Sequence, residues 1–226
     1  MSRPIISPEL PFVSEGPGAD CPRCPRLVEF RQHYRHAEPN WHNAPVRSFG
    51  DLSARLLIVG LAPGLKGANR TGRPFTGDYA GDLLYATLKK FEFAVGQYGA
   101  RADDGFQLID CRICNAVRCV PPENKPEPGE IAACNGFLTE EIAAMSQLKV
   151  VLALGAIAHG AVLKALGERK SAFPFKHGAI HALNTGTLLG DSYHCSRYNT
   201  NTGVLTTEMF EAVFAEIRCR LPPEPA

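Results

Sequence analysis

Continuous apolar runs that alternate with helix-like segments constrain the fold of this chain more than any other feature. The runs RLLIVG (55–60) and KVVLALG (149–155) are apolar at almost every position. Such runs are typical of parallel strands that are buried on both faces. Two further segments, FQLIDCRICNAV (106–117) and TLLGDSYH (187–194), predict two more strands. We therefore expect four strands in one sheet.

Helix-like segments separate or follow these runs. Apolar residues recur three and four positions apart in 79–91, 131–145, 156–167 and from Thr206 to near the C-terminus. This alternation predicts an α/β fold with a parallel sheet, right-handed crossovers and helices on both faces. Ligands bind such sheets beyond the carboxyl ends of the strands. We therefore look for function in the loops that follow the strands.

Length and composition fit a single domain. The chain has 226 residues, of which 45% are hydrophobic, so it can bury a substantial core. We predict a flexible, Pro-rich tail over residues 1–18 and one domain over residues 19–226. The net charge of +1 does not indicate a polyanion-binding surface over the whole chain. No apolar run approaches the ~20 residues of a membrane span, and the first residues do not resemble a signal peptide.

The eight cysteines indicate a reducing compartment, so we expect a cytoplasmic protein with metal binding rather than disulfides. Cys21 and Cys24 form a C-x-x-C pair in a predicted turn. A second pair, Cys111 and Cys114, lies on a predicted strand, where positions three apart face opposite sides and cannot share an ion. We predict one centre with four thiolate ligands, from Cys21, Cys24, Cys119 and Cys134. Four thiolates suit either zinc or a [4Fe–4S] cluster, and spacing does not decide between them.

The stretch GLAPGLKGANRTGRPFTGD (60–78) follows the first strand and contains five glycines. Five glycines exceed the need of a turn, and they indicate that the backbone comes close to a flat or charged partner. Phe75 and Asp78 end this stretch. Taken alone, Phe75 reads as a core residue and Asp78 as the N-cap of the next helix.

With these residues laid out, the chain resembles family 5 of the uracil-DNA glycosylases, the type B enzymes. Four segments carry the resemblance: CPRC, GLAPGLKGANRTGRPFTGD, NAVRCVPPENKPEP and SYHCSRYNTNTGVLTTEMF. It implies a three-layer α/β/α sandwich with a four-stranded parallel central sheet. It also implies that the four predicted cysteine ligands hold a [4Fe–4S] cluster.

The resemblance assigns three catalytic residues. Excision of a base requires the nucleotide to be flipped out of the duplex, while the sugar gains positive and the base negative charge. Asp78 would orient water or face the sugar, and Asn124 would act with it. His194 would donate to the uracil oxygen that gathers charge. The Gly-Leu-Ala-Pro motif has Ala62 where other branches of the superfamily carry a polar residue, so that work must pass to Asp78.

The same resemblance gives a pocket and a DNA-contacting surface. Phe75 would stack on the base, against backbone at Gly60, Ala62 and Gly64, and Asn115 would lie near the uracil edge. The groups expected to contact DNA are Lys66, Arg70, Arg73, Lys125, Arg197, Tyr198 and Asn199.

We therefore expect a monomeric, monofunctional glycosylase that removes uracil from DNA and starts base excision repair. The resemblance implies hypoxanthine, xanthine and hydroxymethyluracil as further substrates, and the apolar Ala62 fits a less selective pocket. The alternative is an iron–sulfur or zinc module that binds nucleic acid without catalysis. An electron-transfer protein is a third reading, which cysteines spread over the loops of a large α/β domain favour least.

Overall fold

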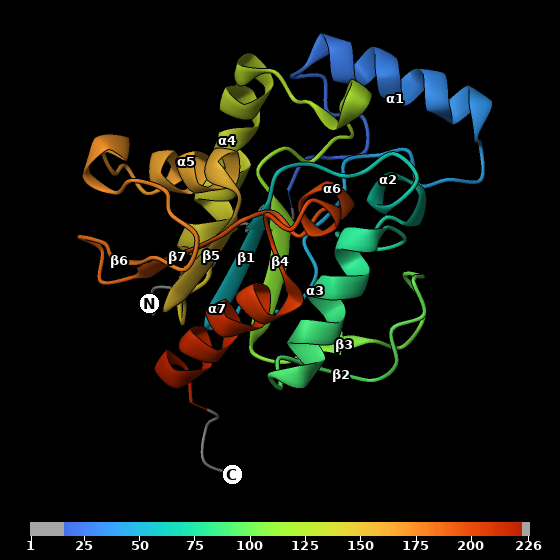
Figure 1. Ribbon diagram of the computed structural model, residues 1–226. Helices are drawn as coiled ribbons and strands as arrows, with labels where there is room; N and C mark the ends of the chain where they lie inside the picture. Colours follow the sequence, from blue (N-terminus) through green and yellow to red (C-terminus); the bar gives the residue numbers. More distant parts are fainter. Residues whose placement is uncertain (1–15, 223–226) are drawn as a thin grey trace, which may run out of the picture.

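The computed structural model describes residues 16–222 and has a mixed five-stranded sheet at its centre (Figure 1). The strand order is β4-β1-β5-β7-β6. The first four strands are parallel to one another, and β6 pairs antiparallel with β7. Their bounds are β1 Leu56–Gly60, β4 Cys111–Asn115, β5 Val150–Leu154, β6 Ile180–Ala182 and β7 Leu188–Ser192.

Seven α-helices and two short 3-10 helices accompany the sheet within the described part of the chain, together with a two-stranded ribbon of β2 (Ala94–Val95) and β3 (Gln107–Leu108). The α-helices are α1 Pro25–Ala37, α2 Ala68–Thr71, α3 Tyr79–Lys90, α4 Pro128–Ala144, α5 Ala156–Ala165, α6 Arg197–Asn201 and α7 Thr207–Arg220. The 3-10 helices are η1 Pro122–Asn124 and η2 Lys170–Ala172.

Two apolar clusters cover the two faces of the sheet. On β1, Leu56 and Ile58 pack into the cluster formed with α3 and α7, whereas Leu57 and Val59 pack into the cluster with α4 and α5. Figure 1 shows α3 and α7 on one side of the strands and α4 on the other. Alternate side chains of a fully apolar strand point to opposite faces of the sheet, so each face packs against a different pair of helices. This agrees with the prediction of strands buried on both faces.

The prediction of four strands, all parallel, needs correction in two places. β6 adds an antiparallel edge strand, because a tight hairpin at Leu183–Thr187 returns the chain directly onto β7. The predicted strand 106–117 is also broken. Asp110 has a φ of 51°, and its carboxylate accepts from the backbone N and the guanidinium of Arg55 at 2.7 Å. This turn separates β3 from β4.

Residues 1–15, most of the predicted tail, lie outside the described residues. Pro17 lines a cavity with four cysteines, and the Gly18 carbonyl accepts a hydrogen bond from Cys21 N at 3.0 Å. Residues 17 and 18 therefore pack with the domain. Between residues 16 and 222, no helix combines the length and apolar character that a membrane crossing needs.

Candidate functional site

The loops after β1, β4 and β7 meet at one cavity of about 590 Å³. This is the edge of the sheet at which parallel α/β folds bind ligands. It brings together seven residues predicted to act on the base or its sugar: Ala62, Gly64, Phe75, Asp78, Asn115, Asn124 and His194. Arg197, predicted to contact DNA, also lines it. Leu61, Pro63, Tyr79, Ala80 and Ser196 complete much of the lining.

Phe75 forms one wall of this cavity. Its side chain is 6% exposed, and its ring lies 6.0 Å from the His194 ring at an interplanar angle of 28°. A Cβ on Gly60 would lie 2.5 Å from Phe75 Cζ and 2.4 Å from Asn115 Oδ1. Real Cβ atoms do not come this close, so only glycine at position 60 allows the ring and the amide to lie against the end of β1.

The two carboxylate oxygens of Asp78 have different surroundings. Its Oδ1 accepts from Gly81 N at 3.2 Å and caps α3, as predicted from its position. Its Oδ2 lies against the glycine backbone, since a Cβ at Gly64 or Gly67 would approach it to 2.9 or 2.4 Å. Burial raises the pKa of this carboxyl, against the opposing hydrogen bond from Gly81. A carboxylate held in a dry pocket is a stronger base than one in water.

His194 follows β7 and faces Phe75 across the cavity. Burial lowers the pKa of its imidazole to about 4, so the ring is neutral at pH 7. Within residues 16–222 no group hydrogen-bonds the ring, whereas its backbone carbonyl accepts from Asn199 Nδ2 at 2.8 Å. The side chain is therefore available to a bound molecule.

Two amides approach from the β4 side. Asn115 is 3% exposed and lines the cavity, and its Oδ1 has no hydrogen-bond partner in the described residues. A buried amide oxygen without a partner is costly, and a ligand N–H would satisfy it. Asn124 reaches the cavity from the exposed loop around η1.

The predicted DNA contacts fall into two groups. Lys66, Arg70, Lys125 and Tyr198 are exposed, and Lys66 lines the mouth of the cavity. Arg197 is also exposed, with its guanidinium 5.5 Å from the centre of the Tyr79 ring. Asn199 points inward to the His194 carbonyl, which makes it a support of the loop.

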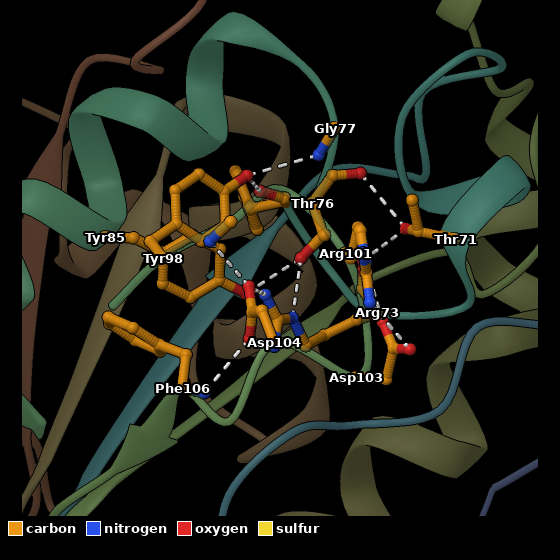
Figure 2. Close-up of polar contacts among 12 residues, drawn as sticks. Thr71, Arg73, Thr76, Gly77, Tyr85, Tyr98, Arg101, Asp103, Asp104 and Phe106 are labelled. Carbon is orange, nitrogen blue, oxygen red and sulfur yellow. Dashed lines mark hydrogen bonds and ion pairs between the residues drawn. The ribbon is translucent and has the colours of Figure 1, made fainter. Parts of the chain in front are cut away.

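Arg73 does not fit its predicted place on the DNA surface. Figure 2 shows its guanidinium turned inward to Asp104, with nitrogen–oxygen distances of 2.8 and 2.7 Å. Its side chain is 4% exposed, and Nε donates to Thr76 Oγ1 at 2.8 Å. The ion pair fixes the segment that presents Phe75. The partner lies 31 residues away in a loop, so a local charge count could not reveal it.

The four predicted cysteine ligands line one small cavity between α1 and α4. Arg31 Nη1 lies 3.4 Å from Cys119 Sγ, and Arg118 N lies 3.4 Å from Cys134 Sγ. Cys111 and Cys114 pack into opposite apolar clusters, as strand alternation predicted.

The spacing of these sulfurs is informative. Among residues of metal-binding types in the part of the chain that the structure describes, one group of three has donor atoms that all lie within 4.8 Å of one another. It consists of His159, His181 and Asp191. No three of the four sulfurs come that close. Thiolates on one tetrahedral zinc ion would be roughly 3.8 Å apart, so among any three of these sulfurs at least one pair is farther apart than two ligands of a single zinc ion.

Sequence reasoning missed some of the lining. Tyr79 and Ser196 border the cavity, and Ser196 also caps α6 by accepting from Asn199 N at 3.4 Å. In the sequence, their role in the lining is indicated only by position, since Tyr79 follows Asp78 and Ser196 lies shortly after His194. The segment that follows the predicted strand TLLGDSYH contains α6, a short helix whose cap sequence S-x-x-N is a weak signal.

Comparison with known proteins agrees with this geometry. Residues 47–218 match the Uracil DNA glycosylase superfamily. The chain is 45% identical over 204 residues to a type-5 uracil-DNA glycosylase of Thermus thermophilus, covering 88% of this chain and 92% of that protein. It is 40% identical over 198 residues to the type-5 enzyme of Pyrobaculum aerophilum, covering 86% of each. A type-4 enzyme of Thermotoga maritima is 39% identical over 110 residues, covering 48% of this chain and 49% of that protein. The chain therefore belongs to the uracil-DNA glycosylase superfamily, in its type-5 branch.

Proposed function

We propose that this protein hydrolyses the N-glycosidic bond of uracil in DNA and so initiates base excision repair. The observation that carries the proposal is the convergence of a buried carboxyl, a neutral imidazole and an unpaired amide oxygen on one cavity walled by Phe75. Flipped bases are recognised by stacking and by hydrogen bonds to their edges. Membership of the type-5 branch supports the same substrate.

In this proposal the pocket holds uracil between its walls. The base stacks on Phe75, and Asn115 Oδ1 accepts from a ring N–H of uracil. Neutral His194 donates one N–H to the oxygen on which negative charge develops. A donor fixed in a dry site stabilises that charge without reorganisation. The low pKa of His194 is consistent with this role, because the neutral ring still carries one N–H that can donate.

Asp78 and Asn124 would serve the sugar side. As the bond breaks, the sugar becomes oxocarbenium-like, and a nearby carboxylate lowers the energy of that positive charge. Asp78 can also accept a proton from the attacking water, while Asn124, which lines the same cavity, orients it. Hydrolysis then gives free uracil and an abasic site, without a covalent enzyme intermediate.

The exposed cations would hold the phosphates. Lys66, Arg70, Lys125 and Arg197 are placed around the cavity mouth or on its flanking loops. Tyr198 is 74% exposed on α6, where it would enter the duplex and support the extruded nucleotide. Asn199 would act indirectly, by fixing the backbone of His194.

We propose that Cys21, Cys24, Cys119 and Cys134 hold a [4Fe–4S] cluster. The spacing of the sulfurs supports a polynuclear centre over a single zinc ion. The group would tie α1 to α4, a structural task, since hydrolysis needs no electron. Cys119→Ser should abolish the visible sulfide-to-iron absorbance, whereas Cys111→Ser, in the core, should retain it.

Further deaminated bases form part of the proposal. Ala62 is half-buried in the cavity lining and offers no polar group, so hypoxanthine, xanthine and hydroxymethyluracil would meet no dedicated rejecting contact there. We also propose a monomer in the reducing cytoplasm. Support comes from a site built from one chain and from eight cysteines, none of which forms a disulfide.

The deciding experiment uses the full chain and a duplex with a single uracil, followed by alkali. Strand cleavage at the uracil is the expected result, and a duplex with thymine at the same position is the control. Binding of the uracil duplex without cleavage would instead support a nucleic-acid-binding module.

A further inference from the structure

The loop that carries Asn124 has an unusual backbone. Glu123 and Asn124 have φ values of 53° and 57°, so two consecutive residues other than glycine adopt the left-handed region. Such residues need support from their surroundings to keep this conformation. Two turn hydrogen bonds hold the loop from within, from Asn124 N to Pro121 O at 3.2 Å and from Lys125 N to Pro122 O at 3.0 Å.

One side chain from outside the loop completes this support. Arg26 on α1 donates from Nη2 to the carbonyl of Lys125 at 3.1 Å. The same guanidinium forms a two-pronged ion pair with Glu130, with Nε–Oε1 at 2.8 Å and Nη2–Oε2 at 2.7 Å. Paired hydrogen bonds of this kind fix direction as well as distance.

Glu130 is itself held in place. It is 6% exposed, and its Oε2 accepts from Glu127 N at 2.8 Å, which closes a capping box at the start of α4. Glu127 also lies near the guanidinium, with Oε1 3.2 Å from Arg26 Nε. Arg26 therefore contacts residues 125, 127 and 130, which lie one, three and six positions after Asn124 in the chain. We call these contacts the Arg26 clamp.

The Arg26 clamp lies next to the cysteine centre. Arg26 lies two residues after Cys24, and neighbouring Arg23 donates to Ala133 O at 3.3 Å, so this end of α1 is fixed on α4. We infer that Arg26 is a positioning residue for uracil excision, which acts by holding the left-handed loop that presents Asn124 to the cavity. This inference rests on the proposed function, in which Asn124 orients the attacking water.

The test is a double-mutant cycle on single-turnover excision of uracil. Arg26→Gln keeps most of the side-chain stem but loses the two-pronged contact, and it should slow excision about tenfold through misplacement of Asn124. Asn124→Gly removes the amide and tolerates positive φ. In the Asn124→Gly background, Arg26→Gln should cost less than twofold further, because the group that it positions is already gone.

Three comparisons make the test decisive. Multiplicative losses in the double variant would overturn the inference, as would a wild-type rate in Arg26→Gln. If Arg26→Gln folds poorly, Glu130→Gln breaks the same clamp from α4 and must show the same dependence on Asn124. Arg35→Gln, which releases the other end of α1 from Asp20 and Asn43, should leave the full effect of Asn124→Gly in place.

Two further readouts separate this inference from its premises. The visible absorbance of the cysteine centre should be unchanged in Arg26→Gln, and its loss would mean that Arg26 serves that centre instead. Absence of excision by the wild-type protein would refute the proposed function. If the wild type excises uracil but the losses of rate in the double variant are multiplicative, only the role of Arg26 is refuted.

Discussion

Aspartate and histidine side chains occur together in two places in this protein, in a buried cluster around Asp191 and, half-buried, in the cavity at Asp78 and His194, and their surroundings differ. Asp191 accepts from His159 Nδ1 at 2.7 Å and lies 3.1 Å from His181 Nε2, and the second ring nitrogen of His159 contacts the Phe173 carbonyl at 2.8 Å. In the cavity, Asp78 is bonded only through its capping contacts, and His194 has no ring partner among the described residues.

The comparison teaches which buried polar groups are free to do chemistry. Around Asp191, both carboxylate oxygens and both ring nitrogens of His159 have partners within the fold, so the cluster fastens the 173–181 segment to α5 and β7. Around Asp78 and His194, burial without full pairing shifts both pKa values toward the neutral form. Perturbed groups in a cleft mark a functional site better than burial or residue type alone.

The sharpest test of this contrast is Asp78→Asn, which keeps the N-cap of α3 but removes the charge. We expect excision to fall on the order of 100-fold, because a carboxylate that serves as base or as counter-charge to the sugar is lost. DNA affinity should be retained. The matched control is Asp82→Asn, an exposed acid one turn further on. Equal rates in wild type and Asp78→Asn would end the proposed mechanism.

The pH dependence of stability tests the desolvation of His194. Its pKa is about 4 when folded, and the unfolded value is about 6.5. As the pH falls through this window the unfolded chain binds the proton first, so the free energy of unfolding decreases. Between pH 7 and 4.5 the wild type should lose about 2 kcal/mol more than His194→Asn in urea titrations. Parallel losses in the two proteins would show that the ring is solvated.

Gly60→Ala tests how closely the cavity wall is packed. The added methyl would push against Phe75 and Asn115, so we expect about a tenfold loss of excision with little change in the fold. Gly129→Ala, in the first turn of α4, has open space around its Cβ and should be neutral or slightly stabilising. Similar kinetics in both variants would contradict the assigned wall.

The smallest effect on excision is expected for His159→Gln, in the paired cluster. Loss of a buried hydrogen-bond partner of Asp191 should lower the free energy of unfolding by about 3 kcal/mol. Excision per folded molecule should remain within about twofold, since the cluster lines no part of the cavity. A larger loss of rate at temperatures where the variant is folded would assign the cluster to catalysis.

Much of the fold could be predicted because buried parallel strands leave long apolar runs. The β1 and β5 runs, the caps at Asp78 and Thr206, and the opposite facing of Cys111 and Cys114 all follow from local pattern. β6 escaped prediction because it has three residues, all partly or fully exposed at the sheet edge. Such a strand depends on its neighbour β7, and its own sequence carries little signal.

The resemblance to a known family, rather than local pattern, pointed to Phe75, Asp78 and His194, and the structure brings all three to one cavity. Their partners could not be predicted. Arg73 was misplaced because its burial depends on Asp104, in a separate loop. The Arg26 clamp likewise joins positions 104 residues apart, which one sequence without contacts cannot relate.

The double duty of Asp78 limits what can stand at that position. A descendant of this protein that had abandoned excision would still need a hydrogen-bond acceptor to begin α3, and serine, threonine or asparagine would serve. Such a replacement could remove activity with little loss of thermal stability. If Asp78 supplies the carboxylate as proposed, the residue at this position would distinguish an active type-5 chain from one that folds but no longer excises uracil.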